Sequence, residues 1–135
     1  GGVQYRSDGG RFWGATFDCS ALYRFNAARR MLADTGLDTA AVADHARTLM
    51  QLFQDAVEDG RAGPLSQAVL LNPLAGDGAR ARFLALRHPE AARWREQLLA
   101  GDIVTDVRDD VIRFGFGLYQ NTEDVEHLIA ACARL

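Results

Sequence analysis

The chain has 135 residues, of which 48% are hydrophobic and 24% are charged, and its formal net charge is -3. This composition is typical of a folded globular domain and excludes a disordered tail. The negative charge argues against a nucleic-acid partner, and no run of 18 apolar residues is present that could span a membrane.

The first third of the chain predicts an irregular start followed by two helices. Residues 1–14 read like the interior of a longer chain, so we expect residues 1–19 to be an interdomain or interface segment. Over residues 20–34, apolar side chains recur every three or four positions, which is one helical face, and Gly36 ends it. A longer helix is predicted from Thr39, a candidate N-cap, to Gly60.

The remaining residues predict short strands alternating with helices. Short apolar runs at 68–71 and 82–87 predict two strands. Pro89 suits the first position of a helix that runs to Ala100 and ends at Gly101. Two β-rich runs, 103–107 and 111–116, are separated by Arg108-Asp109-Asp110 and predict a hairpin.

A final helix is expected to open at Asn121-Thr122, where Glu123 and Asp124 suit the positive end of the helix dipole. The order helix, helix, strand, strand, helix, strand, strand, helix predicts an α+β fold with a small, largely antiparallel sheet and helices on one face. No linker divides the sequence, so we expect a single domain over residues 1–135.

The most informative candidate residue is Arg113, which lies in the run 111–117. Period-two alternation places Ile112, Phe114 and Phe116 on one face and Arg113 on the other. A planar guanidinium binds carboxylate or phosphate with two hydrogen bonds, and Gly115 and Gly117 can open the floor beneath it. The sequence therefore favours an anion clamp, although on residue type alone a solvent-facing strand arginine is the commoner case.

Other candidates carry weaker signals. Gly14-Ala15-Thr16 precedes a helix, so its amides and the Thr16 hydroxyl could hold a phosphate, but such a sequence is more often only a turn. Asp106 and Arg108 flank the hairpin and are expected to form a surface charge pair. No metal site is predicted, because the three histidines, His45, His88 and His127, are spread over three elements.

All 15 basic residues are arginine, and the chain contains no lysine. A chain without lysine cannot form a Schiff base and cannot contain a P-loop. The two cysteines, Cys19 and Cys132, have neither metal-ligand spacing nor a disulfide framework, and no signal peptide precedes them, which predicts a reducing, cytoplasmic location.

Three stretches of the sequence closely resemble one family. They are His88-Pro89-Glu90-Ala91, the run from Leu98-Leu99-Ala100-Gly101 through Asp106-Val107-Arg108 to Arg113-Phe114-Gly115-Phe116, and Leu118-Tyr119 with Asn121-Thr122-Glu123-Asp124-Val125. Together they resemble the C-terminal domain of kynureninases and related enzymes of the class V aminotransferase fold, which use pyridoxal phosphate.

The resemblance implies a role for two residues. Arg113 corresponds to the arginine that binds the substrate α-carboxylate. Thr16 lies where a Gly-Thr pair contributes, across a homodimer interface, to the cofactor phosphate site of the partner subunit. The aldimine lysine and the large domain that carries it have no counterpart here, so the resemblance implies a C-terminal segment of a longer enzyme, or a chain that works with a separate large domain, and no activity alone.

The sequence leaves open which reaction such an enzyme would catalyse, and whether the chain belongs to an enzyme at all. Cysteine desulfurases of the class have a catalytic cysteine in the loop that corresponds to Arg108-Asp109-Asp110, and this loop contains no cysteine. Desulfuration is therefore not expected, and either transamination or C–C cleavage remains as the reaction. Kynureninases commonly read Phe-Thr-Pro-Leu-Tyr where this chain has Phe116-Gly117-Leu118-Tyr119. Outside enzymology, the absence of lysine favours a stand-alone, non-catalytic α+β module that binds a carboxylate or dimerises.

Overall fold

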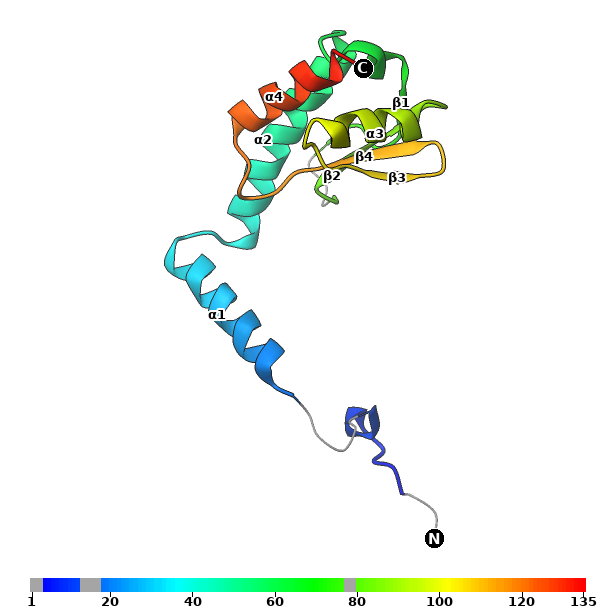
Figure 1. Cartoon of the computed structure of the whole chain (residues 1–135). Coiled ribbons are helices and arrows are strands. Elements are labelled where there is room, and N and C mark those ends of the chain that lie inside the picture. The colour runs from blue at the N-terminus through cyan, green and yellow to red at the C-terminus, as the bar shows by residue number, and fades with distance from the viewer. Residues whose placement is uncertain (1–3, 13–17, 77–79) are drawn as a thin grey trace. The chain divides into compact units, whose positions relative to one another are not determined.

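The computed structural model describes residues 4–12, 18–76 and 80–135 (Figure 1). The chain divides into two compact units, Gly1–Asp38 and Thr39–Leu135. The first contains a short 3-10 helix, η1 (Gly9–Phe12), and helix α1 (Ser20–Asp34), which has the predicted bounds. A single domain over residues 1–135, with residues 1–19 as an interface segment, stays a prediction.

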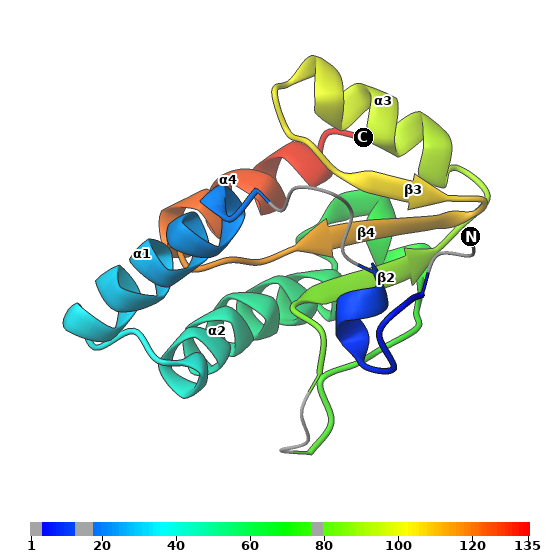
Figure 2. The same cartoon turned by 90° about the horizontal axis from the view of Figure 1, so that it is seen from below.

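The second unit contains the sheet, and its strands pair antiparallel throughout in the order β1-β2-β4-β3 (Figure 2). This confirms the predicted α+β fold. Its elements in chain order are α2 (Thr39–Glu58), the 3-10 helix η2 (Gly63–Gln67), β1 (Val69–Leu70), β2 (Phe83–Arg87), α3 (Ala91–Ala100), β3 (Asp106–Arg108), β4 (Val111–Gly115) and α4 (Thr122–Cys132).

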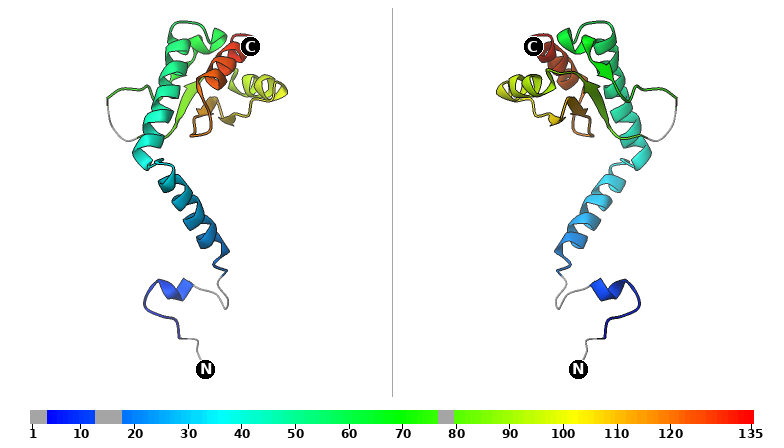
Figure 3. Two further views of the ribbon diagram at one scale, coloured as in Figure 1. Left: turned by 90° about the vertical axis from the view of Figure 1, so that its left-hand side faces the viewer. Right: turned by 90° about the vertical axis from the view of Figure 1, so that its right-hand side faces the viewer.

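Helices α2, α3 and α4 cover one face of this sheet, as the sequence predicts (Figure 3). On β4, Ile112 and Phe114 are buried toward the helices, opposite Leu86 and Leu84 of β2. Burial of these apolar side chains is the main force that holds the layers together. The opposite face of β4 carries partly exposed side chains, Arg113 among them.

The centre of the core is Phe53 of α2, which is fully buried. Its ring lies 4.8 Å from the ring of Phe114 and 5.9 Å from that of Phe116, with the planes tilted by nearly 50°. Such tilted pairs are favourable aromatic geometry. One side chain of the helix layer therefore contacts two rings that follow Arg113, one on β4 and one directly after it.

Several predicted bounds were wrong by a few residues. Helix α3 begins at Ala91 rather than Pro89, because residues 89–90 form a turn in which the Glu90 amide donates to His88 Nδ1 at 3.1 Å. Helix α2 includes Thr39 as its first residue, so Thr39 is not its N-cap. Strand β3 starts only at Asp106, the first residue that pairs with β4, so residues 103–105 lie outside the ladder.

Gly63 lies where the chain passes close to the end of α4. Its φ is +59°, and a Cβ there would lie 2.8 Å from the Cα of Ala133. We expect Gly63→Ala to lower the free energy of unfolding by about 3 kcal/mol, because the left-handed backbone costs roughly 1–2 kcal/mol and the clash is with rigid backbone. Urea unfolding followed by circular dichroism measures the change.

Gly60 provides the matched control for this substitution. Its φ is +85°, and nothing in the described part of the chain lies within 4 Å of a Cβ built there. Gly60→Ala should therefore cost only the backbone term, about 1 kcal/mol. Equal losses for the two variants would show that the approach of Gly63 to Ala133 has no energetic weight.

None of the helices in residues 4–12, 18–76 and 80–135 is both long enough and apolar enough to cross a bilayer.

Candidate functional site

Strand β4 places Arg113 at the middle of the sheet. It pairs with β2 on one side and β3 on the other, so Arg113 has Ala85 and Asp106 as its two cross-strand neighbours. Ile112, Phe114 and Phe116 are buried, whereas the Arg113 side chain is 35% exposed. The predicted alternation of the two faces is confirmed, and the guanidinium lies on the face of the sheet opposite α2, α3 and α4.

Two side chains of neighbouring strands contact the Arg113 guanidinium. Its Nη2 donates a hydrogen bond to Oδ2 of Asp106 on β3, which is also an ion pair. On the β2 side, the guanidinium carbon lies 5.6 Å from the centre of the Phe83 ring, within the range of a cation–π contact. Arg113 is thus held between an acidic and an aromatic neighbour.

The expectation for Asp106 was incomplete. Its Oδ2 lies 3.7 Å from Nε of Arg108, as predicted for a surface charge pair at the hairpin. The closer partner is Arg113, seven positions along the chain and directly opposite in the sheet. Asp106 therefore belongs to the surroundings of the candidate site, which the sequence did not indicate.

A groove of about 780 Å³ runs along this region. Its floor is open at Gly115, where a Cβ would meet no atom of the described residues within 4 Å. At Gly117 a Cβ would lie 3.2 Å from the ring of Tyr119, so that position is already covered. The groove is lined by Arg82, Phe83, Val104, Thr105, Asp106, Arg113, Gly115, Phe116, Gly117, Leu118, Tyr119 and Gln120.

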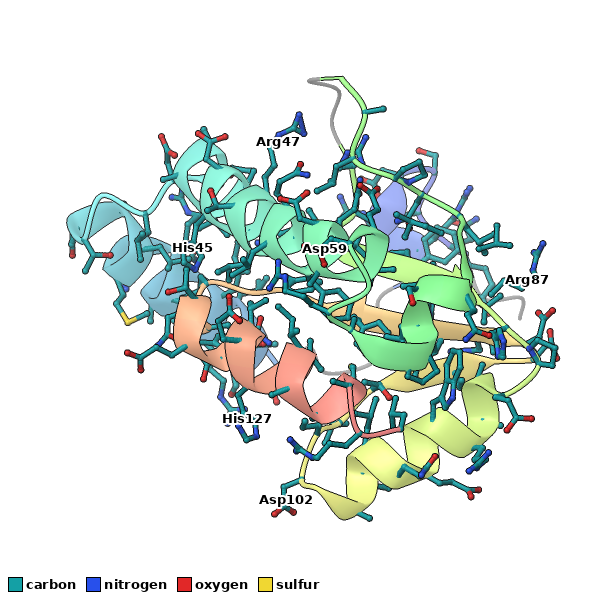
Figure 4. The ribbon with its side chains drawn as sticks, turned by 90° about the horizontal axis from the view of Figure 1, so that it is seen from above. His45, Arg47, Asp59, Arg87, Asp102 and His127 are labelled. Carbon is teal, nitrogen blue, oxygen red and sulfur yellow. The ribbon has the colours of Figure 1, made fainter. Side chains whose placement is uncertain are left out.

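Gln120 fixes the loop that follows β4 and carries Tyr119. Its Oε1 accepts the Gly117 amide at 2.6 Å, and its Nε2 donates to the Gly115 carbonyl at 3.4 Å. Its own carbonyl lies 2.8 Å from Nε2 of His45 on α2, a side chain that Figure 4 labels. Hydrogen bonds therefore hold the loop at the end of the groove, both within the loop and to helix α2.

The start of α4 closes this loop with a capping box. Asn121 Oδ1 accepts the amides of Glu123 at 2.7 Å and Asp124 at 3.1 Å, while Asp124 Oδ2 accepts the Asn121 amide at 2.8 Å. Reciprocal capping satisfies amides that the first turn of a helix leaves free. The helix start predicted at Asn121-Thr122 is confirmed.

A second, smaller cavity of about 370 Å³ lies beside the groove, between α4 and residues 102–105. The two share Thr105, whose Oγ1 is buried and has no hydrogen-bond partner among the described residues. A buried hydroxyl without a partner is unfavourable. The Thr105 hydroxyl, in the segment directly before β3, is therefore a polar group that lies between the groove and the second cavity.

The predicted phosphate contact falls on residues that the structure does not describe. Gly14, Ala15 and Thr16 lie outside the described residues, so the Thr16 role stays a prediction. The histidines belong to different parts of the fold, with His45 on α2 and His127 on α4 (Figure 4). Within residues 4–12, 18–76 and 80–135, no three His, Cys, Asp or Glu side chains gather as metal ligands.

Cys132 supplies no activated nucleophile. Cys132 is fully buried, and burial raises the pKa of its thiol to about 12. The thiol is therefore protonated at neutral pH, and a protonated thiol is a poor nucleophile. The chemistry that the described groove offers is binding: a cation held in place, hydrogen-bond donors and an aromatic wall, which together suit a small carboxylate.

Comparison with known proteins identifies one matching family. A family model described as the kynureninase C-terminal domain matches residues 42–132, more than half of the chain and nearly all of its second unit. No curated protein matches the chain. The matched range contains β4, its neighbours in the sheet and every residue that lines the groove.

Proposed function

The chain belongs to the family of kynureninase C-terminal domains, part of a pyridoxal-phosphate-dependent enzyme family, and we propose that it is the C-terminal domain of such an enzyme, with the class V aminotransferase fold and an amino acid as substrate. The membership covers α2 to α4, the elements that build the groove. The substrate and the reaction are the further steps of the proposal.

In this proposal Arg113 binds the α-carboxylate of the substrate. The observation that carries it is the position of the guanidinium, which lies on the face of the sheet opposite α2, α3 and α4 and lines the groove of about 780 Å³. A charge-assisted, two-point contact fixes the orientation of a carboxylate as well as its position. Arg113 thereby orients the α-carbon of the substrate toward whatever group acts on it.

The residues of this chain do not fit the cofactor by themselves. Pyridoxal phosphate is held through a lysine amine, and all 15 basic residues here are arginine. The cofactor, which supplies an electron sink when bound, must therefore be held by a large domain with its own lysine. Thr16, as a contact to the cofactor phosphate of the partner subunit in a homodimer, remains part of the proposal, as does a cytoplasmic location.

Two reactions are compatible with a carboxylate-binding arginine. One is C–C cleavage of a kynurenine-like substrate, which releases alanine, and the other is transamination, which gives a keto acid. The loop Phe116-Gly117-Leu118-Tyr119 forms one end of the groove, and Tyr119 covers Gly117 there. We propose cleavage first because the family match is to kynureninases.

The test starts with the coding DNA upstream of Gly1 and the complete protein that it encodes. The proposal expects a large domain with a candidate aldimine lysine, encoded in the same frame or as a separate partner, and a purified protein that absorbs near the wavelengths of bound pyridoxal phosphate. L-Kynurenine should then give anthranilate and alanine. Keto-acid formation instead would identify a transaminase, and a complete protein that binds no cofactor would contradict the enzyme proposal.

The second candidate is a non-catalytic module that binds a carboxylate through Arg113 or only dimerises. The absence of lysine favours it. It predicts that the 135-residue chain alone is a stable, well-folded oligomer in gel filtration. Strong binding of a hydrophobic dye, or aggregation, would count against it, since both report exposed apolar surface.

A further inference from the structure

We propose that Asp106 is the positioning residue of the candidate site, which holds the Arg113 guanidinium ready for the incoming carboxylate. The inference rests on the proposed role of Arg113 and extends it to the neighbouring strand. It assigns to Asp106 no contact with the substrate and no part in the chemistry.

The sheet register supports this assignment. Asp106 and Arg113 are directly paired residues of β3 and β4, so their side chains leave the same face. The Phe83 ring, from β2, lies on the other side of the guanidinium. Three adjacent strands therefore each supply one member of the arrangement, and Arg113, on the middle strand, is contacted from both sides.

The contact with Asp106 leaves other N–H donors of the Arg113 guanidinium available to a ligand. A guanidinium has five N–H donors in a rigid fork, and Asp106 is contacted through Nη2. The Arg113 side chain stays 35% exposed and lines the groove, so a ligand can reach it. A free arginine side chain has many rotamers, and a ligand that binds it must order them. Asp106 has already removed part of that freedom.

Asp106 also carries a negative charge, which by itself repels a carboxylate ligand. Arg108, with Nε 3.7 Å from Asp106 Oδ2, offsets part of that charge. Orientation and repulsion predict opposite results when the side chain is removed: loss of orientation weakens carboxylate binding, and loss of repulsion strengthens it. Asparagine separates the two, since it keeps an oxygen acceptor for Nη2 and removes the charge.

The test uses the 135-residue chain, with L-kynurenine as the carboxylate probe. Nitrogen-15 NMR of the arginine Nε–Hε groups reports the order of the Arg113 side chain and its shift on titration. In Asp106→Ala we expect the Arg113 signal to broaden and the titration midpoint to rise about fivefold. In Asp106→Asn both should return to within twofold of the unchanged chain, because the acceptor is restored.

Asp110 provides the matched control. It lies in the turn between β3 and β4, its carboxylate pairs with Arg87 of β2 at 3.7 Å, and it is 53% exposed, close to the 49% of Asp106. Asp110→Ala should leave the Arg113 signal and the midpoint unchanged. In the complete enzyme, Asp106→Ala should raise KM about fivefold and leave kcat within twofold.

The other possible results of this experiment can each be interpreted in one way. Tighter binding in both Asp106 variants would overturn the proposal, because Asp106 would then compete with the ligand. An Arg113 signal as ordered in Asp106→Ala as in the unchanged chain would overturn it as well. If the signal loses order in Asp106→Ala while L-kynurenine shifts nothing even in the unchanged chain, the positioning role is supported. The proposed ligand of Arg113 is then tested separately, by the kcat/KM of Arg113→Ala in the complete enzyme.

Discussion

Replacing Arg113 by alanine should lower kcat/KM of the complete enzyme by about 2 to 4 kcal/mol of transition-state stabilisation, which is roughly 30- to 1,000-fold. The substitution removes a charge-assisted contact from the groove and leaves the ladder of β4 intact, because Arg113 pairs through its backbone. Steady-state kinetics with the amino-acid substrate measure the loss. Arg113→Lys should recover only part of it, since an ammonium lacks the planar fork.

Arg93 is the control for a general effect of positive charge. It is 65% exposed, lies on α3 and does not line the groove. Arg93→Ala should change kcat/KM less than threefold. A loss below threefold for Arg113→Ala itself would remove Arg113 from the substrate site.

Phe53→Ala should lower the free energy of unfolding by about 3 to 5 kcal/mol, the usual cost of removing a buried aromatic ring from a core. Phe53 is fully buried and its ring contacts those of Phe114 and Phe116, so the cavity would open beneath β4. Urea unfolding, monitored by circular dichroism, measures the change. A domain of ordinary stability would lose a large share of its margin.

The control is Leu99, which is 41% exposed on α3. Leu99→Ala should cost less than about 1 kcal/mol, because little apolar surface is removed from the core. If Phe53→Ala were no more destabilising than Leu99→Ala, Phe53 could not be the centre of the helix–sheet contact.

The helices and the alternation of β4 could be predicted because both depend on short-range periodicity. Apolar residues spaced by three and four indicated α1 and α2, and the order Ile112, Arg113, Phe114 indicated which side chain leaves the core. The 3-10 helix η2 was missed because five residues around Pro64 are too few to show a period.

The surroundings of Arg113 could not be predicted in the same way. The contact with Asp106 depends on which residues of β3 and β4 face each other, and that register is set by the hairpin turn. The contact of His45 with the Gln120 carbonyl joins residues 75 positions apart, and it exists only because α2 packs beside the end of β4. Neither pair has a local sequence signal.

The place of β4 within the sheet bears on how such a domain can diversify. On one side it is paired along its whole length with β2, from Phe83 opposite Gly115 to Arg87 opposite Val111. On the other side lies the short edge strand β3, joined to it by a turn in which Asp109 has a φ of +52°. Exposed turns tolerate insertions. Evolution can therefore lengthen this turn and add new chemical groups on the Arg113 side of the sheet, while the ladder with β2 keeps Arg113 in register.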